Sequence, residues 1–239
     1  MTERRNRADS GRAAFPRRTN KNTKERQLSD IMQLILASTS PRRRDILSGL
    51  GVPFTVVTAP TDEHSDITDG PALVRELSCR KARAVRQLLL GRGTLPPDAL
   101  ILGADTMVID PDGCPMGKPQ DPGDAARMLR LLSGRRSAVV SGVTLLDAAG
   151  RTASDADTTE VEFDPLDEAT IARYVASGEP MDKAGAYALQ GIASLWIRGI
   201  HGDHFNVVGL PVHCLEQLMQ QNFHMSLWEI GSPVPPRKE

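Results

Sequence analysis

Charged side chains set inside apolar segments are the residues of this chain with the clearest capacity for chemistry. Asp105 interrupts the apolar segment LILGADTMVID, residues 100–110, and would sit in or beside a buried strand. A carboxylate in that setting is typically a metal ligand, a general base or half of a structural ion pair. Asp62 and Glu63, after the apolar run FTVV, offer further carboxylates, and Lys118 in GKP offers an ammonium. Taken singly, those three residues are more typical of capping acids and a surface lysine.

A second group of charges lies in ASTSPRRRDIL, residues 37–47, where a strand is expected to run into a helix. Ser40 is the expected N-cap and Pro41 the first helical residue, so the first turn holds Arg42, Arg43 and Arg44. The helix dipole opposes cations at that end by up to about 1 kcal/mol each. A bound phosphate would compensate them, because free backbone N–H groups and guanidinium groups converge there. The alternative is a solvated basic turn without a ligand.

Lys81 lies in the middle of the apolar face of a long helix predicted over residues 72–90. At about 100° per residue, that face carries Val74, Leu77, Val85 and Leu88. The arginines of the helix fall on the opposite side: Arg75, Arg80, Arg83 and Arg86. Because burying an unpaired ammonium is prohibitive, we expect Lys81 to meet an anion or a wet cleft. The alternative is a side chain that extends to the edge of the apolar face.

Two stretches in the C-terminal half combine glycine with polar residues and lie between apolar elements. They are EPMDKAGAYALQG, residues 179–191, and GDHFNVVGLP, residues 202–211. Such segments can form ordered loops that approach a ligand. The histidines show neither HxH nor HExxH spacing, so we interpret them as structural or exposed; they are His64, His201, His204, His213 and His224.

The elements that must position these side chains alternate between strand and helix, which predicts an α/β domain with a mixed sheet. Strands are expected at residues 33–38, 99–109 and 194–200, with an antiparallel pair at 138–146 and 158–163 around the Ala149-Gly150 turn. Helices are expected at residues 41–50, 72–90, 123–132, 167–176 and 211–221. The predicted catalytic domain spans residues 32–223.

The two ends of the chain are predicted to lie outside this domain. Residues 1–31 show no apolar periodicity and hold nine Lys or Arg against four Asp or Glu, so we expect a disordered basic extension. It is either a nucleic-acid tether or organelle address, or a non-functional extension ahead of a start at Met32, which we favour. Residues 224–239, ending in SPVPPRKE, are predicted to form a flexible tail.

Composition narrows the class of protein. With 239 residues and 40% hydrophobic content, the chain can build one substantial core. Its three cysteines are far apart and form no CxxC pair, so a reducing compartment, the cytoplasm, is expected: Cys79, Cys114 and Cys214. No apolar run is long enough to cross a membrane, and no signal-peptide core is visible. Outside residues 1–31 the chain is acidic, with 20 basic against 26 acidic residues.

Taken together, the motifs occur in the order and at the spacing of the Maf family: SPRRRDIL, the Glu63 region, the Lys81 helix, GADT, GKPQD, LSGRR, DKAGAYALQG and NVVGLP. The resemblance covers about residues 33–221. It implies a fold like that of the inosine triphosphate pyrophosphatases, with a long twisted mixed sheet, flanking helices and a cleft between two lobes. It also implies hydrolysis of nucleoside triphosphates to a monophosphate and pyrophosphate, assisted by a divalent metal cation, Mg²⁺ or Mn²⁺.

Residue by residue, the resemblance makes Asp105 the proton acceptor and a metal ligand, and Glu63 a second metal-site carboxylate. The substrate-binding positions that it implies are Ser38, Arg42, Arg43, Lys81, Thr106, Lys118 and Gln190. Among them, Arg42, Thr106 and Gln190 match the positions that mark the dTTP/UTP branch of the family. The branch that acts on 7-methyl-GTP generally has other residues there. A pyrimidine nucleoside triphosphate, modified pyrimidines included, is therefore the expected substrate. The sequence is also compatible with a homodimer.

The chain departs from the family pattern at two serines. Ser137 follows LSGRR where the family commonly has His, and Ser141 stands where it has Thr. We expect both to lie away from the phosphate-binding residues and to affect local packing or loop order rather than the reaction.

Three functions of other classes are less consistent with the sequence. A non-catalytic nucleotide-binding or cell-division regulator would retain the cleft, but the presence of Asp105 and both lysines favours an enzyme. Nucleic-acid binding through the basic extension is disfavoured, because Phe15 is its one aromatic residue and the rest of the chain is acidic. A dinucleotide-dependent oxidoreductase is disfavoured because no GxGxxG follows the first strand.

Overall fold

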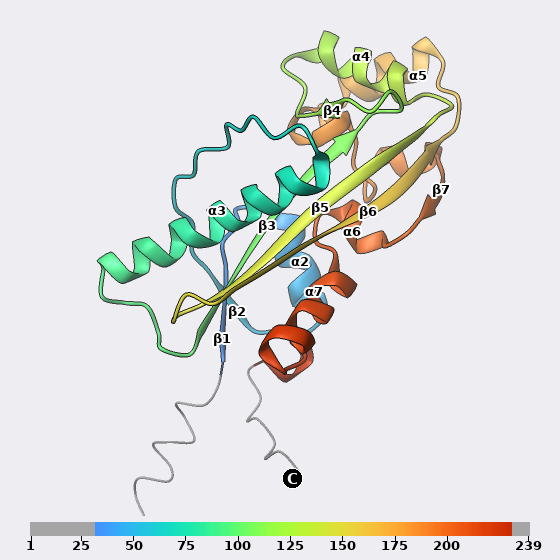
Figure 1. Ribbon diagram of the computed structural model, residues 1–239. Helices are drawn as coiled ribbons and strands as arrows, with labels where there is room; N and C mark the ends of the chain where they lie inside the picture. Colours follow the sequence, from blue (N-terminus) through green and yellow to red (C-terminus); the bar gives the residue numbers. More distant parts are fainter. Residues whose placement is uncertain (1–31, 231–239) are drawn as a thin grey trace, which may run out of the picture.

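Seven strands form one mixed sheet in the part of the chain that the structure, a computed structural model, describes: residues 32–230. Their order is β2-β1-β3-β5-β6-β7, and β4 pairs with β3. The first strand, β1 (Gln33–Leu36), runs parallel to β2 (Phe54–Val56) and β3 (Ala99–Ile109), and all other pairs are antiparallel. The predicted mixed sheet with flanking helices is confirmed (Figure 1). The predicted disordered extension, residues 1–31, lies outside the described residues.

The centre of the sheet consists of three long strands, β3, β5 (Arg136–Asp147) and β6 (Thr152–Phe163). β5 and β6 pair without a break from Arg136 opposite Glu162 to Leu146 opposite Thr152. Gly150 closes the turn between them with a φ of 102°, in the left-handed region that glycine adopts readily. The outer strand β7 (Ile197–His201) pairs with the end of β6.

A gap in strand pairing divides the domain into two lobes. β1 pairs with β3 as far as Leu102, and β4 (Pro115–Met116) pairs with it from Val108 onward. Between these points, no strand of the described chain pairs with that edge of β3. The first lobe contains β1, β2, α2 (Pro41–Gly49), α3 (Gly70–Gly91) and α7 (Val212–Leu218); the second packs α4 (Pro122–Leu132) and α5 (Glu168–Ala176) at the far end of the sheet (Figure 1).

Alternation along β1 explains how the first lobe is layered. Leu34 and Leu36 pack in a core with residues of α2 and α7, whereas Ile35 packs with Ala82 and Val85 of α3. Successive side chains of a strand point to opposite faces, so α3 covers one face of the sheet and α2 with α7 covers the other. A separate core in the second lobe joins α4 and α5 to the far halves of the long strands.

The main differences from the sequence-based expectation concern β6, β7, the 202–211 segment and the C-terminal end of the domain. β6 begins at residue 152 rather than 158, because pairing with β5 satisfies the backbone of the polar segment TASDAD whatever its side chains. The strand expected at 194–200 starts at Ile197, after a 3₁₀ helix at Ile192–Trp196. The loop expected at 202–211 contains α6 (His204–Val208), capped by the Asp203 side chain.

The last difference concerns the C-terminal end of the domain. The final helix α7 continues into a π-helical turn, Met219–Phe223, and a 3₁₀ helix, Leu227–Glu229. Leu227 and Ile230 are buried in the core of the first lobe. The boundary placed at residue 224 is therefore too early, because apolar burial holds the chain against the domain as far as residue 230.

Candidate active site

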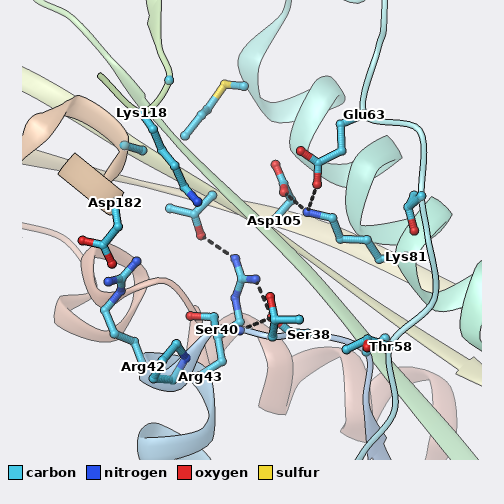
Figure 2. A pocket seen from close by; sticks show the side chains of 18 of the residues that line it. Ser38, Ser40, Arg42, Arg43, Thr58, Glu63, Lys81, Asp105, Lys118 and Asp182 are labelled. Carbon is cyan, nitrogen blue, oxygen red and sulfur yellow. Dashed lines mark hydrogen bonds and ion pairs between the residues drawn. The ribbon is translucent and has the colours of Figure 1, made fainter. Parts of the chain in front are cut away.

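A cleft of about 800 Å³ lies between the two lobes, where β3 has an unpaired edge. Its walls come from the end of β1 and the start of α2, the segment after β2, the middle of α3, β3 and the segment after β4. Eight of the predicted site residues line it together: Ser38, Arg42, Arg43, Glu63, Lys81, Asp105, Thr106 and Lys118. Figure 2 labels all of these except Thr106. Residues distant in sequence thus meet at the carboxyl end of a parallel strand, where α/β sheets commonly bind ligands.

Lys81 is the centre of a charged cluster in this cleft. Its Nζ lies 2.6 Å from Oδ1 of Asp105 and 2.8 Å from Oε1 of Glu63 (Figure 2). The side chains of Lys81 and Asp105 are only 18% and 13% exposed, whereas that of Glu63 is 62% exposed. The expectation that Lys81 meets an anion is confirmed, and it meets two.

Two glycines allow α3 to approach the sheet closely enough for this contact. A Cβ on Gly103 would lie 2.1 Å from the backbone oxygen of Ser78, and one on Gly142 would lie 2.4 Å from that of Val74. Gly103 and Asp105 are two residues apart on β3, so both face α3. Lys81 lies one turn after Ser78 on α3, and the close packing brings its ammonium to Asp105.

Arg80, which precedes Lys81 on α3, holds the segment that carries Glu63. The Arg80 guanidinium donates through one nitrogen to the carbonyl oxygens of Asp62, at 3.3 Å, and His64, at 2.7 Å. Its Nε donates to Glu76 at 2.8 Å. Consecutive residues of α3 therefore hold consecutive residues of the segment, Lys81 through the Glu63 side chain and Arg80 through the flanking backbone. The sequence placed Arg80 only on the polar face of the helix and did not indicate this contact.

Arg43 is buried at the start of α2 and is engaged by the protein itself. Its guanidinium donates to Ser38 Oγ at 2.9 Å, to Thr106 Oγ1 at 3.1 Å and to the carbonyl oxygen of Gly209 at 2.8 Å. Burial lowers its pKa to about 10, a shift that the charge of Asp105 partly offsets. Arg43 stays cationic at neutral pH and joins the segment after β1, β3 and the segment after α6. Its position in the cleft agrees with the phosphate-contacting role that the resemblance implies, but most of its donors already hold the site together.

Ser141 lies closer to the site than the sequence suggested. Its hydroxyl forms a 2.8 Å hydrogen bond with Thr106 and donates to the carbonyl oxygen of Asn206 at 3.1 Å. The expectation that it lies away from the phosphate-binding residues is wrong for this serine, since it contacts a cleft residue directly across the β3–β5 pair. Ser137, in contrast, is buried in the second lobe, and its hydroxyl has no hydrogen-bond partner among the described residues.

The remaining charges of the cleft lie on its accessible walls. Arg42 is partly exposed and Lys118 is exposed, so both present cations to the cleft from opposite lobes (Figure 2). Arg44 is exposed and does not line the cleft. Asp182 from the second lobe also lines it, and the hydrogen bond from Lys183, with a smaller contribution from Arg42, lowers the pKa of Asp182. The DK pair of EPMDKAG was the signal that could have identified Asp182.

Gln190 lies in a smaller pocket of about 70 Å³ that adjoins the cleft. The two share Ser40, Arg42, Arg43, Thr106 and Ala184. One wall of the smaller pocket is the 183–191 loop, which contributes Lys183, Ala184, Tyr187, Ala188, Leu189 and Gln190. The three residues expected to mark the substrate branch, Arg42, Thr106 and Gln190, therefore meet around this pocket.

Glu63 and Asp105 are the carboxylates best placed to hold a metal ion. No group of three or more His, Cys, Asp or Glu residues suited to a metal occurs among residues 32–230. Mg²⁺ is commonly bound through one or two carboxylates, with water and substrate phosphate oxygens completing the coordination. The carboxylates of Glu63 and Asp105 both bind the Lys81 ammonium and line a cleft with room for phosphates. This arrangement of oxygen ligands suits such an ion.

The other expectations about residue types can also be compared with the structure. All five histidines are exposed, as predicted, and none lines the cleft. Cys79, Cys114 and Cys214 are free thiols, and burial is the main cause that raises the pKa of Cys214 to about 12. Across the described helices, none combines the length and apolar character required of a membrane span.

The fold and the site define an α/β protein whose interlobe cleft arranges cations from both lobes around a lysine–dicarboxylate centre. The family model described as "Maf-like protein" matches residues 33–222, and the chain belongs to this family. The dTTP/UTP pyrophosphatase of Symbiobacterium thermophilum is 46% identical over 192 residues, 80% of this chain and 94% of that protein. The dTTP/UTP pyrophosphatase of Alkaliphilus oremlandii is 42% identical over 199 residues, 82% of this chain and 100% of that protein.

A solved structure from Mycobacterium abscessus, titled nucleoside-triphosphatase / dITP/XTP pyrophosphatase, matches 56% of this chain and 76% of its own. Its sequence identity is 18% and its TM-score 0.35.

Proposed function

We propose that this protein is a dTTP/UTP pyrophosphatase, which hydrolyses the triphosphate between its α and β phosphates to a nucleoside monophosphate and pyrophosphate. Relatives that match four fifths of the chain carry that name. The observation that carries the proposal is the meeting of Asp105, Lys81 and Glu63 with Arg42, Arg43 and Lys118 in one cleft. Such a set combines a proton acceptor with charges for a polyphosphate.

Asp105 is the residue proposed to act on water. Its Oδ1 is bound to Lys81, and its side chain lines the cleft although it is largely buried. The other carboxylate oxygen would therefore accept a hydrogen bond from a water molecule in the cleft, next to the scissile phosphate. Accepting that water's proton while it attacks the α-phosphorus would contribute roughly 10² to 10⁴ in rate. Phosphoryl-type transfer asks little covalent chemistry of the protein, so the remaining side chains would act by position and charge.

The cations divide between the two lobes. Lys118 and Arg42 are the more accessible pair and are proposed to bind the phosphates that leave as pyrophosphate. Lys81 would contact a phosphate from its place between the carboxylates, and Arg43 and Ser38 would contribute through the donors that the protein leaves free. Charge-assisted hydrogen bonds to phosphate are among the stronger ones that proteins form.

A divalent cation, Mg²⁺ or Mn²⁺, is proposed to bind at Glu63 and Asp105. When bound, it would neutralise phosphate charge and polarise the phosphoryl oxygens. Glu63 is suited to this because its side chain is exposed to the cleft while Arg80 fixes the backbone on either side of it.

Base recognition is proposed for the smaller pocket. The Gln190 amide can donate to and accept from the carbonyl and N–H groups on the edge of thymine or uracil. A site built on such hydrogen bonds rejects bases that leave its buried groups unpaired. Modified pyrimidines that keep this edge are proposed as further substrates.

The test is a turnover assay with Mg²⁺ or Mn²⁺ against dTTP, UTP, CTP, ATP, GTP and 7-methyl-GTP, with monophosphate and pyrophosphate measured separately. We expect dTTP and UTP to lead, with equal amounts of the two products. A preference for 7-methyl-GTP would assign the chain to the other branch of the family. Nucleotide binding without turnover would instead support a non-catalytic regulator, and release of orthophosphate would contradict cleavage between α and β.

On the sequence grounds given above, we also propose that the protein works in the cytoplasm. A homodimer is the assembly that we propose to test, by light scattering of the full chain.

A further inference from the structure

We infer that Glu179 is a positioning residue, whose carboxylate holds the 183–191 loop in place as the wall of the smaller pocket. The inference rests on the proposed function in one respect, that this pocket receives the base. Glu179 lines neither the cleft nor the smaller pocket, so it would act through the loop and not by touching the nucleotide.

The carboxylate of Glu179 closes the loop at its C-terminal end. The backbone N–H of Ile192 donates to both of its oxygens, at 2.9 Å to Oε1 and 3.1 Å to Oε2. Glu179 and Ile192 are 13 positions apart in the sequence, and the loop lies between them. The bond therefore fixes the chain two residues after Gln190.

The same residue holds the N-terminal end of the loop through its backbone. The Lys183 ammonium donates to the carbonyl oxygen of Glu179 at 3.3 Å and also binds the neighbouring Asp182. Lys183 is itself part of the pocket wall. Both ends of the loop are thus joined to Glu179, one through its side chain and the other through its main chain.

A buried tyrosine ties this arrangement to the core of the second lobe. The Tyr174 hydroxyl donates to Glu179 Oε1 at 2.9 Å, and the residue is 2% exposed. Its ring packs edge-on against Trp196, with 5.3 Å between ring centroids. Burial, followed by the hydrogen bond to Glu179, raises the pKa of Tyr174, so the hydroxyl stays protonated and keeps donating. The carboxylate is held by the core and in turn holds the loop.

Gly191 shows how closely the loop and the carboxylate fit. A Cβ at this position would lie 2.1 Å from Glu179 Oε1 and 2.5 Å from the carboxyl carbon. A side chain at this position would therefore require the Glu179 carboxylate or the loop to shift, which would disturb the bond to Ile192. The sequence GlnGly in this loop therefore serves the contact with Glu179.

The consequence for function is a separation between base selection and chemistry. Asp105 and Lys81 stand on β3 and α3, outside this loop, whereas Gln190 lies within it. A displacement of about 1 Å in a recognition group can cost up to roughly 10²-fold in selectivity or rate. Loosening the loop should therefore lower the preference for dTTP and UTP more than it lowers turnover at saturating substrate.

The test compares Glu179→Ala and Gly191→Ala with Glu168→Ala, which removes a surface carboxylate of α5 paired with Arg130. For each we would measure kcat and kcat/KM for dTTP and GTP, and amide hydrogen exchange across residues 184–192. We expect both loop variants to lose about tenfold or more in the dTTP/GTP ratio of kcat/KM, with kcat for dTTP within about threefold and faster exchange in the loop. The Glu168→Ala variant should match the wild type.

Several outcomes distinguish the inference from the proposed function. If the wild type turned over none of the nucleotides, the proposed function would be overturned. Amide hydrogen exchange in the loop would still report whether Glu179 holds it. Unchanged selectivity and unchanged exchange in Glu179→Ala would overturn the inference. If Glu179→Ala fails to fold, Gly191→Ala decides the question alone, because its added Cβ forces the carboxylate and the loop apart whichever of the two moves.

Discussion

The Nζ atom of Lys81 lies 2.6 Å from Oδ1 of Asp105, which joins the middle of α3 to the middle of β3. The contact depends on Gly103, since any side chain there would push α3 away from the strand. The same ammonium lies 2.8 Å from Glu63, which arrives on a segment held by Arg80. The arrangement of the cleft can therefore be tested through its chemistry and through its packing.

Replacing the proposed general base should abolish most turnover and spare the fold. Asp105→Asn keeps the size of the side chain but removes its charge and its capacity to accept a proton. We expect kcat to fall by at least about 10²-fold, with thermal unfolding changed far less. Asp112→Asn is the matched control, because Asp112 pairs with Arg135 on the exposed surface. A folded Asp105→Asn variant with normal turnover would refute the catalytic assignment, and a large loss of melting temperature with normal activity per folded molecule would make Asp105 a structural ion.

Removing Lys81 should change metal binding and nucleotide turnover in opposite directions. In the structure Lys81 occupies the two carboxylates proposed to bind the cation, so Lys81→Met should leave them free. We expect Mn²⁺ to bind the nucleotide-free protein about five- to tenfold more tightly, since a part-buried ion pair no longer competes, a difference of roughly 1 kcal/mol. Turnover should fall by about 10- to 10²-fold, because a charge-assisted hydrogen bond to phosphate is lost.

The control for this experiment is Lys118→Met. Lys118 lines the same cleft without an ion pair to Glu63 or Asp105, so its loss should leave Mn²⁺ binding to the free protein unchanged. Titration followed by electron paramagnetic resonance measures the affinity directly. Weaker Mn²⁺ binding by Lys81→Met than by the wild type would show that the ammonium organises the carboxylates instead of competing with the metal.

The two neighbouring arginines of α2 should separate stability from binding. Arg43→Lys cannot reproduce the three hydrogen bonds that reach Ser38, Thr106 and Gly209. We expect the free energy of unfolding to fall by about 2 to 4 kcal/mol, since hydrogen bonds to charged groups contribute about 1.5 to 3 kcal/mol each. Arg42→Lys lies outside this network, so its unfolding free energy should stay within about 0.5 kcal/mol while KM for dTTP rises. Urea unfolding and initial rates test both, and equal stability of the two variants would contradict the structural role of Arg43.

The close packing of α3 against β3 predicts a specific glycine requirement. In Gly103→Ala the new Cβ would lie 2.1 Å from the Ser78 carbonyl oxygen, so the helix must move. We expect a loss of about 1 to 3 kcal/mol in unfolding free energy, the usual range for overpacking, together with lower turnover because Lys81 moves with the helix. Gly91→Ala, in the last turn of the same helix and in open space, should be neutral or stabilising by up to about 1 kcal/mol. Calorimetry and turnover measured on the same preparations would show whether the two glycines differ; similar behaviour would mean that α3 is free to adjust.

The sequence by itself singled out the residues that we propose to carry the chemistry. Lys81 on an apolar helical face and Asp105 in an apolar strand stand out because a charge in such a place needs a partner. Helix and strand positions followed from periodicity and capping, as at α2, where Ser40 is the N-cap and Pro41 the first helical residue. Motif order added the family, which the family match over residues 33–222 confirms.

Only the tertiary structure decided which of these residues meet, and how. Arg43 bonds a carbonyl 166 positions away, and Ser141 reaches Thr106 through the register of β3 and β5. The pairing of Lys81 with both Asp105 and Glu63 depends on how closely a helix packs on a sheet, and the place of Gln190 depends on a loop held by Glu179. Local pattern reports the propensity and burial of each element, but distances between elements come from register, close packing and buried hydrogen bonds, which many distant residues set together.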